Sequence, residues 1–220
     1  MKEIITNWKV YDLEETLVSS GYAMIEEYNE SFVKTQTETL ASYLSEFNGN
    51  YKEDNNHYKR ATKLAKAPLN SGHVSFAKGI VVNMDVTFTN KAWIEMQRYH
   101  FIDIITGMST MHRISKFDLD SAFNEYTDPV IISRLKELQE VYLETKDKED
   151  YLKLLYSTPS GLEMTGRVTT NYLQLMNIYS QRRTHRLPEW RIFCKELLEK
   201  LPLFYEFLEA NGSLYKEDVR

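Results

Sequence analysis

Apolar residues recur three and four positions apart over several long stretches, which is the spacing of one face of an α-helix. In the first third of the chain this pattern covers residues 13–28 and 31–46, and residues 59–67 predict a shorter helix that stops near Pro68. The most polar segment, residues 48–60, predicts a surface loop that leads into this helix. This part of the chain is therefore expected to be largely helical.

Proline and capping residues divide the second half of the chain into further helices. Asp128 followed by Pro129 has the form of a cap followed by a first helical residue. Asn90 is expected to cap an earlier helix, and the last helix is expected to bend at Pro202 and end at Gly212. The helices predicted in this way cover residues 91–102, 130–145, 149–156, part of 165–183, and 189–210.

Two segments predict strands. Residues 79–89 are rich in β-branched side chains, and residues 2–11 predict a second strand. The chain has no internal repeat and no low-complexity linker, so a single domain over residues 1–220 is expected. Many helices with a small sheet predict the α+β fold class.

The composition excludes several classes of protein. Hydrophobic residues make up 42% and charged residues 27% of the chain, which is typical of a folded globular protein and not of a disordered one. The net charge of −5 argues against a general nucleic-acid surface, although a local basic cluster can still bind a small anion. No stretch approaches the roughly 18 uninterrupted apolar residues of a membrane span. The N-terminal residues lack the apolar core of a signal peptide and Cys194 stands alone, so a cytoplasmic location is expected.

The segment Gln97–Arg113 has arginine and histidine at both ends. Arg98 and His100 precede an apolar run, and His112 and Arg113 follow a Gly-Met-Ser-Thr sequence. Placing two such pairs around an apolar stretch indicates that an anionic or polar ligand binds between them.

A row of neutral amides lies along one predicted helix. At about 100° per residue, Gln174, Asn177 and Gln181 share a face. Asn171 and Arg182 border that face. Exposed helix faces usually carry Glu and Lys, so the amides indicate contact with a polar partner, and a solvated face is the alternative.

Two further features are candidates for binding. Residues 182–186 (Arg-Arg-Thr-His-Arg) follow that helix directly, and arginine binds phosphates and carboxylates through two hydrogen bonds. Part of this charge could instead only offset the helix dipole. His73 stands just before the predicted strand at 79–89, where it is either functional or a structural or solvated histidine.

The common catalytic and metal-binding motifs are absent from the sequence. It contains no His-Glu-x-x-His, Cys-x-x-Cys or Gly-x-Ser-x-Gly motif, no P-loop and no Gly-x-Gly-x-x-Gly. No metal site and no glycine-rich nucleotide cradle are therefore expected. Composition and spacing alone predict an α+β protein with an anion site.

Three stretches, in family order, resemble the flavin-dependent thymidylate synthases. The first is Ser-Gly-His-Val-Ser-Phe around His73, similar to the family's Gly-His pair before its central strand. The second is Arg-Tyr-His at 98–100 with Ser109 and Arg113 downstream, where the family has Arg-His-Arg and then Ser-x-Arg. The third and most specific is residues 169–192, similar to the family's Thr-x-Asn-x-Arg-x-Leu-x-Asn helix and the arginine five residues after it.

The chain departs from the family pattern at several of these positions. Tyr99 and His100 replace the second and third residues of Arg-His-Arg, and Ser109 is not followed by arginine two residues later. Leu173 stands where the family has arginine, and residues 187–189 (Leu-Pro-Glu) replace Ala-Gln. Each change falls on a flavin or nucleotide contact of the family, so a divergent member is implied.

The resemblance implies an FAD-dependent enzyme that transfers a one-carbon unit from methylenetetrahydrofolate to C5 of dUMP, giving dTMP, with NADPH as the reductant. It also implies a small central antiparallel sheet and a homotetramer with sites between subunits, without nucleic-acid or membrane partners. Arg182 is the implied catalytic residue, because a guanidinium at the uracil ring stabilises negative charge as it develops. The implied substrate-binding residues are Arg98, Ser109, Arg113, Lys153 and Arg182. The implied flavin-binding residues are His73, Tyr99, His100, Asn171, Asn177 and Arg186.

Two alternatives remain open. The altered segment at 98–113 also fits a sister flavoenzyme that modifies another pyrimidine nucleotide, for example by hydroxymethylation of dUMP or dCMP. The other alternative is an interaction protein that keeps the fold without the chemistry. A colourless protein that binds neither flavin nor nucleotide would favour it.

Overall fold

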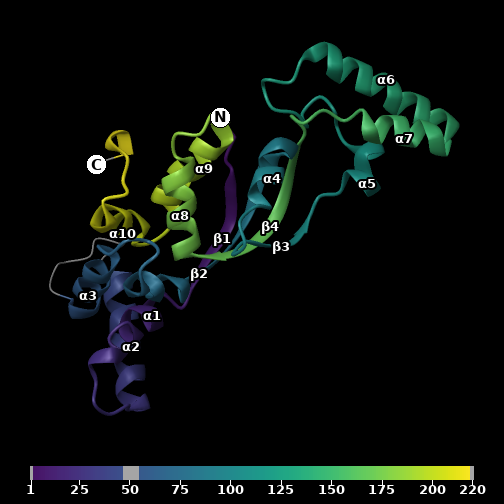
Figure 1. Cartoon of the computed structure of the whole chain (residues 1–220). Coiled ribbons are helices and arrows are strands. Elements are labelled where there is room, and N and C mark those ends of the chain that lie inside the picture. The colour runs from purple at the N-terminus through teal and green to yellow at the C-terminus, as the bar shows by residue number, and fades with distance from the viewer. Residues whose placement is uncertain (1, 47–54, 219–220) are drawn as a thin grey trace. The chain divides into compact units, whose positions relative to one another are not determined.

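The computed structural model describes residues 2–46 and 55–218, and Figure 1 shows the whole chain. The chain divides into two compact units. The unit named here the α4–α7 unit comprises Met1–Thr6 and Asp85–Val168. The unit named the α8–α10 unit comprises Asn7–Met84 and Thr169–Arg220. A single domain over residues 1–220 stays a prediction.

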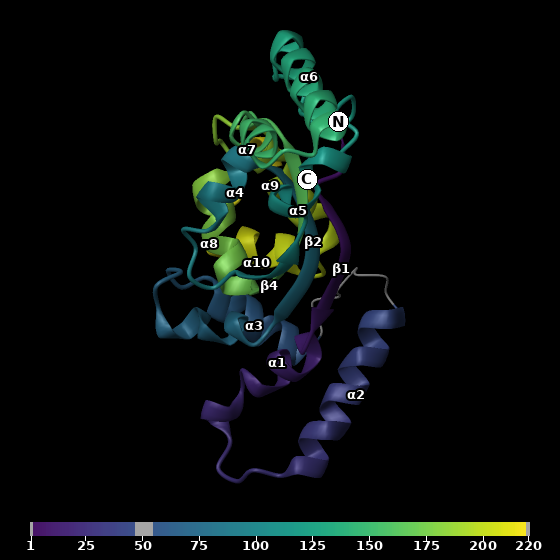
Figure 2. The ribbon, with the colours of Figure 1, turned by 90° about the vertical axis from the view of Figure 1, so that its right-hand side faces the viewer.

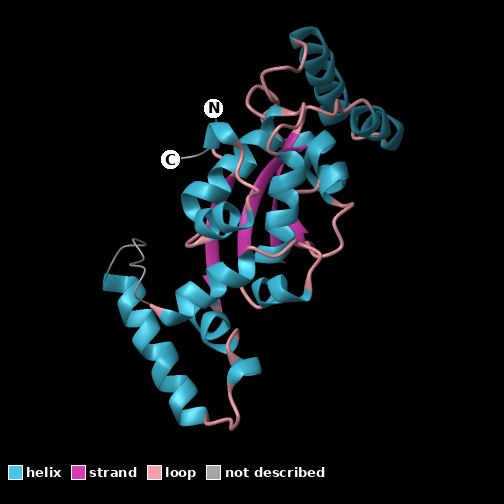
Figure 3. Ribbon diagram, turned by 60° about the vertical axis from the view of Figure 1, so that its left-hand side comes forward, coloured by secondary structure: helices cyan, strands magenta, loops and turns pink. Residues whose placement is uncertain are grey.

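Four strands form one antiparallel sheet in the order β1-β2-β4-β3. Figure 3 shows the strands in magenta. The strands are β1 (Ile5–Tyr11), β2 (Val81–Thr89), β3 (Asp103–Gly107) and β4 (Glu163–Asn171). The strands predicted at 2–11 and 79–89 are confirmed as β1 and β2, which run side by side (Figure 2). β3 and β4 are additional to the prediction. The α+β class, helix-rich with a small sheet, is confirmed.

Cross-strand side-chain pairs show the register of β2 against β4. Asp85 accepts a hydrogen bond from Arg167 at 3.0 Å. Two residues further along β2, Thr87 bonds Thr165 at 2.7 Å, so the strands run in opposite directions. The residues that alternate with these on β2 are buried: Val82, Met84, Val86 and Phe88. This alternation is what the β-branched pattern of the segment predicts.

The α4–α7 unit carries a helical hairpin, α6 and α7, whose helices lie side by side (Figure 1). Its helices are α4 (Asn90–Met96), α5 (Thr110–Arg113), η3 (Ile114–Lys116), α6 (Pro129–Thr145) and α7 (Lys148–Tyr156). Asp128 accepts a hydrogen bond from the Val130 amide at 2.8 Å, which confirms the cap predicted before Pro129. A small core lies under the hairpin: Ile114, Leu119, Leu135, Leu154 and Leu162.

The α8–α10 unit has a core of aromatic rings. Its helices are α1 (Leu13–Ser19), η1 (Tyr22–Met24), α2 (Glu30–Glu46), α3 (Asn56–Ala65), η2 (Gly72–Lys78), α8 (Tyr172–Arg182), α9 (Pro188–Lys200), α10 (Phe204–Asn211) and η4 (Lys216–Asp218). Tyr172 packs edge-to-face on Phe204 at 5.4 Å between ring centroids, and its hydroxyl donates to the carbonyl of Pro202 at 2.7 Å. Six of these rings are fully buried: Tyr172, Tyr179, Trp190, Phe193, Phe204 and Phe207.

The helix predicted over residues 13–28 is wrong beyond Ser19. The Arg60 guanidinium donates to the carbonyls of Leu17 and Val18 at 2.9 and 3.1 Å, so it takes acceptors that a longer helix would need. It also packs against Gly21, where a Cβ atom would stand 2.6 Å from the guanidinium carbon. A long-range contact therefore ends the helix.

The cap and length predicted for the helix at 91–102 are also wrong. Thr89 is the N-cap and accepts from the Ala92 amide at 3.2 Å, while Asn90 is already helical. The helix ends at Met96, because the chain becomes extended to pair as β3 with β4. Tertiary pairing overrides the helical pattern here.

The segments around residues 165–183 and Pro202 differ from expectation in one respect each. The long helix is present as α8, but β4 precedes it up to Asn171. Pro202 separates α9 from α10 instead of bending one helix, because it forces the preceding residue into an extended conformation. Gly212 ends α10 in the left-handed conformation, as predicted. Residues 48–54 of the predicted loop lie outside the described residues, and the helix α3 begins at Asn56.

Candidate functional site

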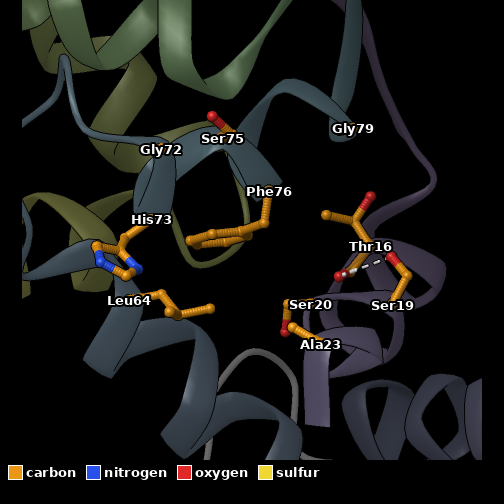
Figure 4. Close-up of a pocket in the computed structure, with 10 residues that line it drawn as sticks. All are labelled: Thr16, Ser19, Ser20, Ala23, Leu64, Gly72, His73, Ser75, Phe76 and Gly79. Atoms are coloured by element: carbon orange, nitrogen blue, oxygen red, sulfur yellow. Dashed lines mark hydrogen bonds between the residues drawn. The ribbon is translucent and has the colours of Figure 1, made fainter. Parts of the chain in front are cut away.

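A cavity of about 510 Å³ lies in the α8–α10 unit between η2, α1 and α3 (Figure 4). It is lined by Thr16, Ser19, Ser20, Ala23, Leu64, Gly72, His73, Ser75, Phe76 and Gly79. Its size is within the range of roughly 300–1,000 Å³ that is usual for small-molecule sites. Four hydroxyls, one imidazole and one aromatic ring line it, and no Asp, Glu, Lys or Arg does. This lining suits a flat ring system that carries hydrogen-bonding edges.

The 3₁₀ helix η2 holds His73 and Phe76 at the cavity. Ser71 caps η2 by accepting from the His73 amide at 3.2 Å. The Phe76 ring is held by an edge-to-face contact with Phe207, at 5.5 Å between ring centroids. His73 is exposed and lies on the same wall as Phe76 (Figure 4). His73, which the sequence predicts to contact a flavin, therefore lines this cavity.

Arg60 lies outside the cavity and bonds Ser20, which lines the wall opposite η2. Its Nε donates to the Ser20 hydroxyl at 3.1 Å, and that hydroxyl donates to the carbonyl of Leu17 at 2.7 Å. His57 lies on the far side of Arg60, with its Nδ1 atom 2.9 Å from the guanidinium. Because arginine can only donate, Nδ1 is the acceptor and the ring proton is on Nε2, which bonds Gln36 at 3.0 Å. Burial and the Arg60 charge lower the pKa of His57.

Helix α8 carries the predicted amide row, and η2 packs against this helix. Asn171 caps α8 by accepting from the Gln174 amide at 3.0 Å, and the side-chain nitrogen of Asn177 donates to the Leu173 carbonyl at 2.9 Å. Gln174 is buried, Asn177 is half-buried and Gln181 is exposed. The row is therefore not a uniformly solvated face, and the side chains of Asn177 in the row and of Asn171 at its border bond the helix itself.

Arg182, the last residue of α8, is held by two aromatic side chains. Its guanidinium carbon lies 5.0 Å from the ring centroid of Trp190, which is fully buried in α9. Its NH1 atom lies 2.8 Å from Nε2 of His185. A guanidinium over an indole face is a favourable cation–π arrangement. Two contacts, one on the face and one on the edge of the guanidinium, therefore hold the residue predicted as catalytic.

The other arginines of residues 182–186 have different surroundings. Arg183 lies between the rings of Tyr179 and Tyr215, 5.7 Å from each centroid, and donates to the Ser180 carbonyl at 2.5 Å. Arg183 therefore tethers the C-terminal segment to α8. Arg186 is exposed.

The C-terminal segment is further fixed by Tyr179, whose hydroxyl donates to Asp218 at 2.5 Å. Burial and the hydrogen bond to Asp218 raise the pKa of Tyr179.

Burial likewise raises the pKa of the Cys194 thiol to about 12, so this cysteine is not a nucleophile at neutral pH.

In the α4–α7 unit, the predicted Arg-Tyr-His lies in the turn after α4. Arg98 and His100 are exposed, and Tyr99 is half-buried. The apolar run that follows forms the exposed edge strand β3. Ser109 is the residue before α5, and its carbonyl accepts from the Arg113 amide at 3.1 Å.

Lys153, predicted to bind phosphate, lies on α7 and pairs with Asp150 at 2.8 Å. This hydrogen bond raises the pKa of Lys153 and lowers that of Asp150. The Lys153 side chain is 60% exposed and that of Asp150 is 17% exposed, so water reaches the pair and it contributes little to stability.

The described residues contain no group of three or more His, Cys, Asp and Glu side chains that could hold a metal ion. Within the same ranges, no helix has both the length and the apolar character needed to cross a bilayer.

By sequence, no family model and no curated protein matches the chain. By structure, it is similar to thymidylate synthase X (ThyX) from Helicobacter pylori, solved with FAD and dUMP, with a TM-score of 0.61 at 14% identity over 94% of this chain and 97% of that one. The chain has the fold of the flavin-dependent thymidylate synthases. It is also similar to the UMP/dUMP methylase PolB from Streptomyces cacaoi, solved with 5-Br UMP, with a TM-score of 0.54 at 13% identity over 97% of both chains.

The resemblance inferred from the sequence is confirmed as a ThyX-like fold with divergent sequence. Sequence reasoning missed two residues that the structure places at candidate positions. Phe76 stands three residues after His73, in the Ser-Gly-His-Val-Ser-Phe stretch itself. His185 is part of the basic segment at residues 182–186, but only the structure shows that its ring contacts the Arg182 guanidinium.

Proposed function

We propose that the chain is a flavin-dependent enzyme that transfers a one-carbon unit from methylenetetrahydrofolate to C5 of dUMP. The observation that carries the proposal is Arg182, held over Trp190 at the end of α8, in a fold that ThyX shares. That neighbour was crystallised with FAD and dUMP, the two ligands that the proposal needs.

The cavity beside η2 fits a portion of FAD. The aromatic ring of Phe76 and the imidazole of His73 offer flat contacts, and Ser75 adds a hydroxyl to the lining. The Ser20 hydroxyl already bonds Arg60 and the carbonyl of Leu17. The flavin, when bound, supplies the one-carbon carrier and the reducing equivalent of the reaction. The proposed flavin-binding residues are His73, Tyr99, His100, Asn171, Asn177 and Arg186.

The chain's own task is to bind the pyrimidine and polarise it. Negative charge develops on a carbonyl oxygen of the uracil ring when C5 becomes nucleophilic. Arg182 donates hydrogen bonds to that oxygen. Because Trp190 and His185 already orient the guanidinium, little reorganisation is needed at that moment.

The phosphate of dUMP is a dianion and needs cationic and hydroxyl partners. The proposed partners are Arg98, Ser109, Arg113 and Lys153. The proposal includes NADPH as the reductant, a cytoplasmic location and a homotetramer whose sites form between subunits.

The test is spectroscopic and kinetic. Purified protein is expected to be yellow, with the absorbance bands of bound flavin, and to oxidise NADPH faster when dUMP is added. Colourless protein that binds neither FAD nor dUMP would contradict the proposal and favour an interaction protein that keeps the fold.

A sister activity is the second candidate. The similarity to a UMP/dUMP methylase, together with the altered Arg98–His100 segment, favours a different pyrimidine nucleotide or a different one-carbon product. Incubation with dUMP, UMP or dCMP, followed by mass analysis of the nucleotides, separates the two. A methylated dUMP supports the first candidate, and a hydroxymethylated product or a UMP or dCMP product supports the second.

A further inference from the structure

We infer that His185 is a positioning residue that sets the orientation of the Arg182 guanidinium, an inference that rests on the proposed function. His185 lies in the short connection between α8 and α9. Nothing in the sequence pattern singled it out from its basic neighbours.

The first observation is the geometry around the guanidinium. Nε2 of His185 lies 2.8 Å from NH1 of Arg182, while the Trp190 ring lies under the same guanidinium at 5.0 Å. The His185 ring itself packs edge-to-face on Trp190, at 6.4 Å between centroids and 75° between planes. A long arginine side chain otherwise has many rotamers, so contacts on its face and on its edge together select one.

The second observation is that His185 is itself fixed. Its amide donates to the carbonyl of Arg182 at 2.9 Å. Arg191 donates to the carbonyls of His185 and Arg186 at 2.6 and 3.1 Å. The connection is therefore tied to both α8 and α9, and the imidazole is carried on a rigid support.

The third observation concerns the lone pairs of the imidazole. Nδ1 of His185 lies 3.2 Å from the Leu187 amide, so two N–H donors aim at one ring. A neutral imidazole has one ring nitrogen that accepts, and it serves Arg182 or Leu187 but not both. The Arg182 contact is shorter and its donor is charged, so it is the stronger one. Nε2 of His185 is therefore the nitrogen that accepts, and it holds the Arg182 guanidinium in its place over Trp190.

The test compares three variants in the steady state with dUMP. His185→Leu removes the acceptor and is expected to lower kcat about tenfold to hundredfold, as loss of a hydrogen bond to a charged group does. The flavin content is expected to stay unchanged. His185→Gln offers a side-chain oxygen to Arg182 and is expected to recover part of kcat. Thr184→Ala, at an exposed neighbour in the same connection, is the matched control and is expected to behave as the unaltered enzyme. An unchanged kcat in His185→Leu would overturn the inference.

Crystal structures separate this inference from the proposed function. If the unaltered protein shows no flavin and no turnover, the proposed function fails, whatever the variants do. The inference is then decided by structure. Arg182 is expected to leave the Trp190 ring in His185→Leu and to stay there in Thr184→Ala. A guanidinium that keeps its place over Trp190 in His185→Leu would overturn the inference.

Discussion

The indole ring of Trp93 lies directly against the main chain of Gly166, where a Cβ atom would stand 3.0 Å from two ring carbons. The ring cannot easily retreat, because its Nε1–H donates to the carbonyl of Met164 at 2.9 Å and Phe88 packs edge-to-face on it at 5.9 Å. Because Gly166 of β4 has no side chain, Trp93 of helix α4 can pack directly against the sheet.

Replacing Gly166 tests how closely helix α4 packs against the sheet. Gly166→Ala is expected to lower the free energy of unfolding by about 1–3 kcal/mol through overpacking against Trp93. Gly107→Ala on the neighbouring strand is the matched control, since its Cβ would make only ordinary contacts at 3.4 and 3.5 Å. Urea unfolding of both variants measures the difference, and equal effects would contradict the account.

The cavity wall offers a second prediction, at Gly79. A Cβ atom there would stand 2.6 Å from Oγ1 of Thr16, so Gly79→Ala must displace a buried side chain that lines the cavity. We expect reduced flavin content and a lower unfolding midpoint. Thr16→Ala in the same chain frees the space and is expected to restore much of both. If the double variant is no better than Gly79→Ala, the clash is not the cause.

The His57–Arg60 contact predicts an acid-sensitive stability. Burial and Arg60 lower the pKa of His57 in the folded protein, so the unfolded chain takes up a proton first as the pH falls below about 6.5. The contribution of His57 to the free energy of unfolding is therefore fully present above about pH 6.5. It is lost as the pH falls towards the pKa of His57 in the folded protein, and it does not change further below that pKa. The free energy of unfolding is measured by urea titration at about pH 7.5 and about pH 5.5.

A matched pair of variants isolates this term. His57→Gln is neutral at every pH and is expected to show a smaller loss between the two pH values. His112→Gln, at an exposed histidine of the α4–α7 unit, is expected to keep the loss of the unaltered protein. An identical loss in His57→Gln would show that another group titrates.

Much of the fold follows from local sequence signals. The alternation along β2 and the Asp128-Pro129 start of α6 depend on neighbouring residues only, and both are confirmed. The end of α1 at Ser19 depends on Arg60, some forty residues away in sequence. The strand β3 depends on β4 for its hydrogen bonds. Such long-range contacts leave no mark in the local pattern.

The candidate site shows the same division. Sequence similarity selected His73, and the structure places it at a cavity. It also selected Asn171 and Asn177, but the sequence could not show that their side chains bond α8 itself. Their flavin contacts, like the other residue roles, stay predictions.

The most direct test of the central claim is turnover by Arg182→Ala. The account predicts that this variant keeps its flavin but loses at least about a hundredfold in the rate at which dUMP is converted to a methylated product, as measured by mass analysis. Arg182→Ala that methylates dUMP at the unaltered rate, with unaltered affinity, would contradict the account.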